Sequence, residues 1–147
     1  MSPKHLSAAG LVIGAAAILA GCAAATPQEA PPAVIKPVAG SQIPQLQLTE
    51  RAVQRLGLVT QPVRQATTAG QLPHEVIPYS AVVYDTDGST WAYVDVAART
   101  YERKPVSVTE IDGQTALLSA GPAVGAAVVT VGAAELLGTE YDISGEE

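Results

Sequence analysis

Alternation of apolar and polar residues dominates the second half of the chain. Apolar side chains alternate with polar ones or form short runs in residues 76–84 (VIPYSAVVY), 90–96 (TWAYVDV), 101–111 and 114–120. Such patterns, bounded by Gly, Pro and Asp, are typical of β-strands. A continuous apolar run at 126–131 (AAVVTV) indicates a buried strand. The pattern predicts a mainly β fold: a small β-barrel-like or sandwich domain of about six to seven strands with one short helix.

The short helix is expected where the folded part begins. Thr49 is a good N-cap because its hydroxyl can accept from a free backbone N–H of the first turn. Gly57 can take the left-handed conformation that ends a helix. We therefore predict a two-turn helix at residues 49–56 and a strand at 58–63. Residues 64–75 are expected to form an exposed loop.

The stretch Asp85-Thr86-Asp87-Gly88 permits two interpretations, a hairpin turn or a calcium loop. A helix–loop–helix calcium loop starting at Asp85 would need a bidentate glutamate at its twelfth position, which is Val96. The flanking segments are also predicted strands. A hairpin turn without an ion is therefore the prediction.

Further turns are expected towards the C-terminus. Asp112-Gly113 predicts a two-residue hairpin turn, because both central residues of that turn type need positive φ. Val106, Val108 and Ile111 are the expected inward residues of the strand before it. Residues 132–138 are expected to form one helical turn stopped by Gly138, followed by a frayed acidic tail at 144–147.

Composition and charge exclude several classes of function. The formal charge is -6 and the basic residues do not cluster, so a nucleic-acid surface is not expected. Beyond residue 22 the only histidine is His74, which follows a proline in a polar segment and is expected to be solvated. No metal-ligand spacing, nucleophile elbow or phosphate loop occurs. We expect no enzyme activity, no catalytic or cofactor-binding residues, no cofactor and no metal.

The N-terminus has the layout of an export signal. Lys4 precedes an apolar run at residues 11–20, which is too short for a comfortable transmembrane helix. Leu19-Ala20-Gly21-Cys22 then resembles the bacterial lipobox. The resemblance implies a lipoprotein signal peptide at 1–21 and acylation of Cys22. The alternative is a plain secretory signal with an unrelated cysteine.

A tether and one domain are expected after the signal. Residues 22–45 are rich in Ala and Pro and poor in bulky apolar side chains, so they predict a flexible tether. Fully extended, it would reach on the order of 70 Å. Residues 46–143 would then form a single β domain.

Two segments resemble one protein family. Residues 46–63 (LQLTERAVQRLGLVTQPV) are similar to the opening of the mature part of periplasmic adaptor subunits, or membrane fusion proteins, of resistance-nodulation-division (RND) efflux pumps. Residues 76–94 and 100–136 resemble the C-terminal, membrane-proximal domain of the same family. The resemblance implies that both segments meet in one membrane-proximal domain, with the turn at Asp85 in a hairpin.

The chain also departs from the family. In complete adaptors a β-barrel, a lipoyl-like domain and a long helical hairpin separate the two segments, whereas only residues 64–75 join them here. The usual charged turn is replaced by residues 119–128 (SAGPAVGAAV), which are small and apolar. The conduit and the contact with an outer-membrane channel are therefore not expected of this chain.

Three functions remain open. The first is a lipid-anchored extracytoplasmic binding module that docks on an RND-type transporter or another membrane protein. The alternatives are a cell-envelope lipoprotein with a structural or interaction role unrelated to transport, and a carrier of small ligands. The expected location is the extracytoplasmic face of the cell membrane; Ala23 would also permit sorting to an outer membrane.

Lipidation of Cys22 has a direct test. Cys22→Ala should yield an uncleaved or soluble protein that no longer partitions into the detergent phase, because the thiol that carries the lipid is gone. Ala24→Ser is the matched control and should partition like the wild type. Unchanged mass and membrane association of the Cys22→Ala protein would show that the lipobox interpretation is wrong.

Overall fold

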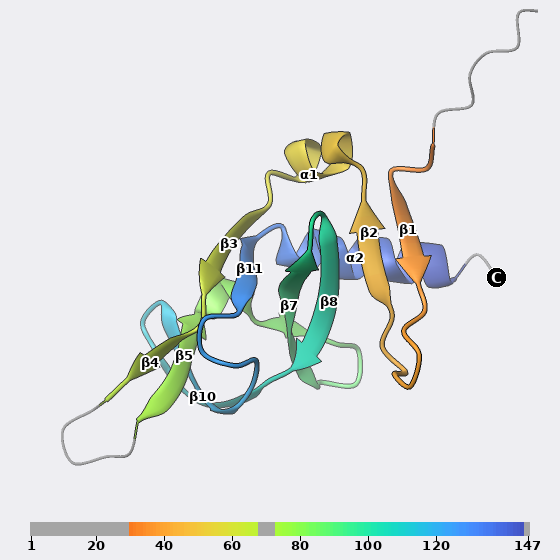
Figure 1. Ribbon diagram of the computed structural model, residues 1–147. Helices are drawn as coiled ribbons and strands as arrows, with labels where there is room; N and C mark the ends of the chain where they lie inside the picture. The colour runs from red at the N-terminus through yellow and green to blue at the C-terminus, as the bar shows by residue number, and fades with distance from the viewer. Residues whose placement is uncertain (1–29, 68–72, 146–147) are drawn as a thin grey trace, which may run out of the picture.

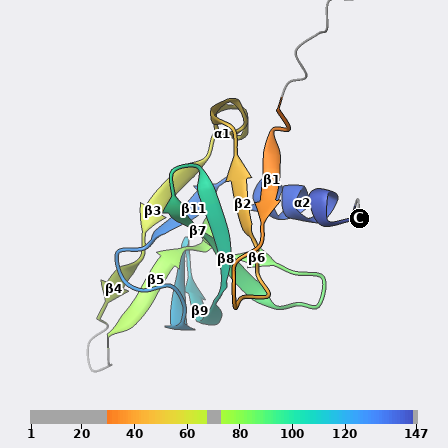
Figure 2. The same cartoon turned by 45° about the vertical axis from the view of Figure 1, so that its right-hand side comes forward.

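The computed structural model describes residues 30–67 and 73–145. Two antiparallel β-sheets dominate them, so the mainly β prediction is confirmed, and the sheets do not close into a barrel. Figures 1 and 2 show the larger sheet beside two helices and the smaller sheet at the opposite end. The predicted signal peptide and Cys22 lie outside the described residues.

The larger sheet has seven strands. In spatial order they are β1 (Ala33–Lys36), β2 (Gln45–Leu48), β8 (Thr100–Pro105), β7 (Thr90–Ala97), β11 (Ala127–Val131) and β3 (Val59–Pro62), with β6 (Val83–Tyr84) also paired to β7. The smaller sheet has four. Its order is β4 (Arg64–Ala66), β5 (His74–Pro78), β10 (Thr115–Ala120) and β9 (Ser107–Asp112).

The predicted first helix is confirmed. Helix α1 spans Glu50–Leu56; the hydroxyl of its N-cap Thr49 accepts from the Ala52 N–H at 3.2 Å. Gly57 follows it with φ 62°, the left-handed conformation expected of a C-cap. The predicted strand follows as β3.

The second helix is longer than predicted. Helix α2 spans Ala133–Ser144 and passes through Gly138, which was expected to stop it. Ala133, Leu136 and Glu140 are its buried residues, at helical spacing, so the face they share holds the helix on the sheet. Packing of this face outweighs the low helix propensity of one exposed glycine.

The tether prediction is wrong from Ala33 onward. Strand β1, Ala33–Lys36, pairs with β2, so the fold begins well before residue 46. Ala33 and the β2 residues Leu46 and Leu48 are buried. At four residues β1 is too short to show a clear period of two, and prolines on both sides of it are typical of a loop, so its own composition does not reveal a strand.

The join between the two matched segments is a hairpin. Residues 64–75 were expected to form a loop, but β4 and β5 pair with Arg64 opposite Val76 and Ala66 opposite His74. Residues 68–72 lie outside the described residues. All three β4 residues are exposed, so β4 carries none of the apolar alternation that would have revealed it. A 3-10 turn, η1 (Tyr79–Ala81), leads from β5 to β6.

Two hairpin turns follow the predictions in outline. Residues 85–89, the Asp85–Gly88 stretch and Ser89, connect β6 to β7, with Gly88 at φ 84°. The β9–β10 turn is shifted by one residue: Thr115 lies opposite Asp112, so Gly113 and Gln114 form the loop. Only Gly113 of these has positive φ, the pattern of a II′ turn.

Two hydrophobic cores lie on the two faces of β7. Trp91 and Tyr93 face the first core with α1 and α2, whereas Ala92 and Val94 face the second, between the sheets. This division is the one that strand alternation predicts. Of the expected inward residues, Val106 is buried and Val108 packs against the second core, but Ile111 is 45% exposed, because β9 is an edge strand.

Gly132 and Gly138 provide a stability test. Gly132 has φ 86°, and a Cβ there would lie 2.2 Å from Leu58 Cδ2, so Gly132→Ala should cost at least about 1 kcal/mol. A Cβ at Gly138 would meet nothing within 4 Å, so Gly138→Ala should stabilise α2 by about 0.5–1 kcal/mol. Urea unfolding followed by Trp91 fluorescence measures both.

Gly125→Ala separates the two effects at Gly132. Gly125 has φ 90°, and a Cβ added there would meet no atom within 4 Å, so this variant reports backbone strain alone. If Gly132→Ala costs no more than Gly125→Ala, the contact with Leu58 has no energetic weight.

Candidate binding surface

The Asp85–Gly88 turn, the first candidate cation site, is held by protein donors. The Asp85 N–H donates to Ser89 O at 2.9 Å, and the Gly88 N–H donates to Asp85 O at 2.9 Å. Asp87 Oδ1 accepts from the backbone N–H and hydroxyl of Ser89 at 2.8 and 2.6 Å. Among the described residues, no group of three or more His, Cys, Asp or Glu side chains could hold a metal ion.

Arg103 lies at the centre of a charged cluster between the turn and α2. Its Nη1 is 2.7 Å from Asp85 Oδ2, and its Nε is 3.1 Å from Glu140 Oε1. The second contact is an ion pair without hydrogen-bond alignment. The guanidinium also stands 4.8 Å from the centre of the Trp91 ring, within cation–π range. We call Asp85, Trp91, Arg103, Glu140 and Tyr141 the arginine cluster.

Two tyrosines complete the hydrogen bonding of the cluster's carboxylates. The buried Tyr93 hydroxyl donates to Glu140 Oε2 at 2.6 Å, and Tyr141 donates to Asp85 Oδ1. The pKa of Tyr93 is raised, first by burial of its hydroxyl and second by the hydrogen bond to Glu140. Glu140 is itself buried, and this pairing satisfies it.

The pKa of Asp85 is lowered to about 2 by the hydrogen bond from Tyr141, then by those from the Thr86 backbone and Arg103. Because this pKa lies below the unfolded-state value of about 3.9, ionised Asp85 stabilises the folded protein at pH values above about 4. That stabilisation is lost as the pH falls from about 4 through about 2.

The arginine cluster therefore holds α2 against β7 and β8. Its acceptors are already occupied by protein donors, which favours a structural role over catalysis. On the other face of β8, the buried Glu102 accepts from Gln45 Nε2 of β2 at 2.9 Å and from Lys104 of β8 itself. Glu102 thus ties β8 to β2, and Arg103 contacts Trp91 of β7.

A pocket of about 380 Å³ lies where the two sheets meet. Its polar lining consists of Gln61, Arg64, Ser80, Gln114 and Thr115. Its apolar lining consists of Pro62, Val76, Ile77 and Pro78. We call it the junction pocket; its volume falls in the range of small-ligand sites, about 300–1,000 Å³.

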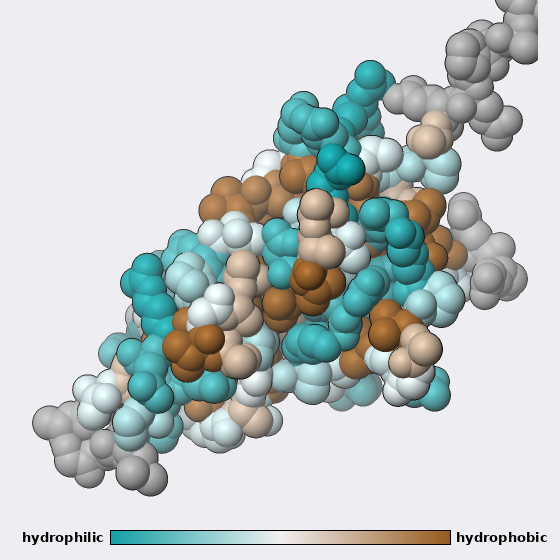
Figure 3. Space-filling model, in the orientation of Figure 1, coloured by the Kyte–Doolittle hydropathy of each residue, from teal (hydrophilic) through white to brown (hydrophobic). Residues whose placement is uncertain are grey.

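A pair of exposed tyrosines begins beside the junction pocket, because Tyr79 lies between the lining residues Pro78 and Ser80 in the chain. Tyr79 and Tyr84 are 38% and 52% exposed and their hydroxyls lie 3.3 Å apart. The Tyr79 N–H donates to the carbonyl of the pocket residue Gln114 at 2.8 Å. Figure 3 shows further apolar surface below α1, near the start of β3.

Few of these site residues could be identified from the amino-acid sequence. His74, expected in a loop, is half-buried in β5, opposite Ala66. The predicted lipidation site, Cys22, lies outside the described residues. Arg103 lies within the alternating segment 101–111 and Glu140 lies beyond the predicted helical turn at 132–138, and no motif marks either position. The charges at 103 and 140 offered no local signal, because their pairing depends on how α2 packs.

Comparisons with known proteins add no relative: no family model, no curated protein and no solved structure matches this chain. Within the part of the chain that the structure describes, no helix is long and apolar enough to span a membrane.

Removing Arg103 tests the structural role of the cluster. Arg103→Met should leave Asp85 and Glu140 without their cation and lower the free energy of unfolding by roughly 2–3 kcal/mol. This is below the 3–5 kcal/mol of a fully buried pair because the Arg103 side chain is 16% exposed. Arg64→Met is the control, since Arg64 is exposed and has no ion pair among the described residues. Equal stability of the two variants, measured by urea unfolding, would contradict this role.

Proposed function

We propose that this chain is a lipid-anchored extracytoplasmic binding module that docks on a transporter or another membrane protein, as the resemblance to RND-pump adaptors implies. The observation that carries the proposal is the pairing of β3 with β11. Val59–Pro62 comes from the first adaptor-like segment and Ala127–Val131 from the second, yet they are hydrogen-bonded neighbours. This is the arrangement expected of a membrane-proximal adaptor domain, which takes strands from both segments.

The β4–β5 hairpin further supports this proposal. It stands at the join where complete adaptors carry their other domains. Here the chain leaves β3 at Pro62 and returns in β5 from His74, with β4 and β5 paired directly. A domain closed in this way keeps its own fold without those parts. Binding is therefore a role it can retain, whereas forming a conduit is not.

The anchor would keep the domain close to the membrane. Ten residues, 23–32, separate Cys22 from the start of β1. Fully extended, they span at most roughly 35–40 Å, about half the reach expected of a tether to residue 45. A partner must therefore expose its contact surface near the membrane, which favours a membrane protein. We also propose a non-enzymatic role.

The alternatives share the anchor and differ in the partner. A structural envelope lipoprotein would contact envelope components unrelated to transport. A small-ligand carrier would use a cavity such as the junction pocket, which is open to solvent along the β3–β4 edge.

In-cell photo-crosslinking tests the docking proposal. A photoreactive amino acid at Thr60, on the exposed β3, or at Tyr84 should form crosslinks to one membrane protein, identified by mass spectrometry. Position Asp142, exposed on α2, is the control and should give few or none. Crosslinks should fall when Cys22→Ala releases the protein.

The same experiment can refute the proposal. Crosslinks from Thr60 and Tyr84 only to envelope polymers or to other lipoproteins would favour the structural alternative. Crosslinks to a membrane protein that persist unchanged in the Cys22→Ala background would show that the anchor is not needed for docking.

A further inference from the structure

The junction pocket lies along a strand that crosses from one sheet to the other. β3 is an edge of the larger sheet and β4 an edge of the smaller one, and only Val63 separates them. Val63 is 1% exposed; its N–H donates to Ala126 O at 2.8 Å and its carbonyl accepts from the Gly125 N–H at 2.9 Å. The crossing is thus fixed by burial and by two hydrogen bonds. The pocket beside it is built on a rigid frame.

The lining of this pocket has a charge opposite to that of the chain. The chain carries 14 Asp and Glu against 8 Lys and Arg, yet the pocket lining includes one guanidinium, that of Arg64, and no carboxylate. Arg64 forms no ion pair within residues 30–67 and 73–145. The amides of Gln61 and Gln114 can also donate hydrogen bonds. A guanidinium with neighbouring donors matches a carboxylate.

The remaining surface suits an extended chain rather than a free ion. Every residue of β3 is exposed, and among the described residues no strand lies beside its outer edge. Val59 and Val131 lie opposite each other there and are 46% and 50% exposed. An extended segment that lies along this edge would place apolar side chains on these valines and the next side chains over the pocket.

We propose that the junction pocket binds a carboxylate side chain of an extended acidic segment of the docking partner. This inference rests on the proposed docking function and names the partner's chemistry. Arg64 would take the carboxylate, while Val76 and Pro78 contact the methylene stem. The exposed β3 edge would align the segment.

Synthetic peptides test the pocket with the full-length chain in phosphatidylcholine nanodiscs. The probe is fluorescein-labelled Val-Thr-Val-Glu-Val-Thr-amide, and its twin carries Gln in place of Glu. Fluorescence anisotropy should show tighter binding of the Glu peptide. Arg64→Gln should weaken that binding roughly two- to fivefold and abolish the preference for Glu, and Arg64→Lys should retain part of it.

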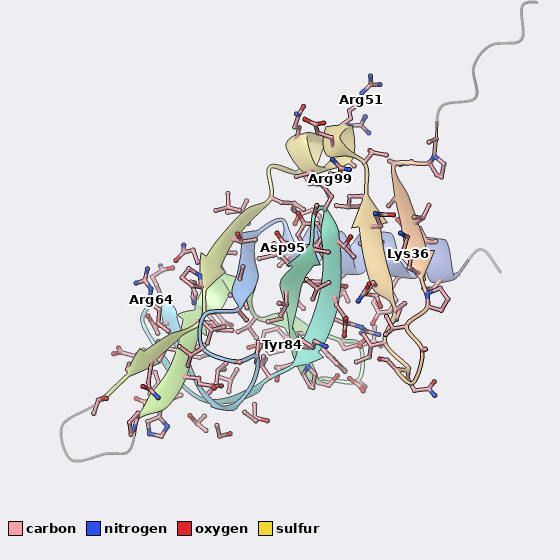
Figure 4. The ribbon with its side chains drawn as sticks, in the orientation of Figure 1. Lys36, Arg51, Arg64, Tyr84, Asp95 and Arg99 are labelled. Carbon is pink, nitrogen blue, oxygen red and sulfur yellow. The ribbon has the colours of Figure 1, made fainter. Side chains whose placement is uncertain are left out.

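Lys36→Gln is the matched control. It removes the same charge from the exposed end of β1, at the opposite edge of the larger sheet (Figure 4). It should leave peptide binding unchanged. Equal affinity for the Glu and Gln peptides, or equal losses in Arg64→Gln and Lys36→Gln, would overturn the proposal.

Two further binding measurements test whether the pocket takes an anion other than a peptide carboxylate. Inorganic phosphate that binds more tightly than the Glu peptide would replace the proposal with a free-anion site. Arg64-dependent binding to phosphatidylglycerol vesicles without peptide binding would replace it with a lipid headgroup site. If crosslinking identifies a membrane partner but the peptides fail, only the pocket inference is wrong. If the peptides bind but crosslinking fails, the docking function is wrong.

Discussion

The second hydrophobic core lies between the two sheets, and the path of the chain depends on it. Ala92 and Val94 of β7 face Ile77 and Leu118 of the smaller sheet within this core. Four of its residues, Val63, Ala81, Val82 and Val106, also lie where the chain passes from one sheet to the other. Burying these residues fixes both the packing and the crossings. The absence of Phe leaves Val, Ala, Leu and Ile to fill the space, so the sheets must approach closely there.

The first core, on the other face of β7, depends on α2 to cover it. Leu136 is fully buried there, and Glu140, one turn further along, meets Arg103 and Tyr93. The apolar contact and the ion pair lie on the same face of the helix, so each holds the other in place. A buried carboxylate without these partners would be costly. The charged cluster therefore fixes the position of α2 as much as it adds stability.

Features that depend on neighbouring residues could be predicted from the sequence. Side-chain chemistry predicts the cap at Thr49 and the turn that contains Gly88. Strand alternation predicts the two faces of β7. The features that could not be predicted depend on distant partners. Strand β1 exists because β2 is beside it, and α2 continues past Gly138 because its inner face is buried. The junction pocket combines residues from β3, β5 and the β9–β10 turn, so no single segment signals it.

Anchoring changes how strong a docking contact needs to be. One partly solvated arginine with a few neutral donors gives only a weak site, because exposed ion pairs contribute about 0–1 kcal/mol. Two proteins held at the same membrane, however, meet at an effective concentration that short flexible linkers can raise to about millimolar. Under the proposed acylation of Cys22, only ten residues would separate the lipid from β1. In the proposed docking, a weak, charge-selective contact would then be enough for specificity, because the lipid would supply the proximity that the pocket alone does not.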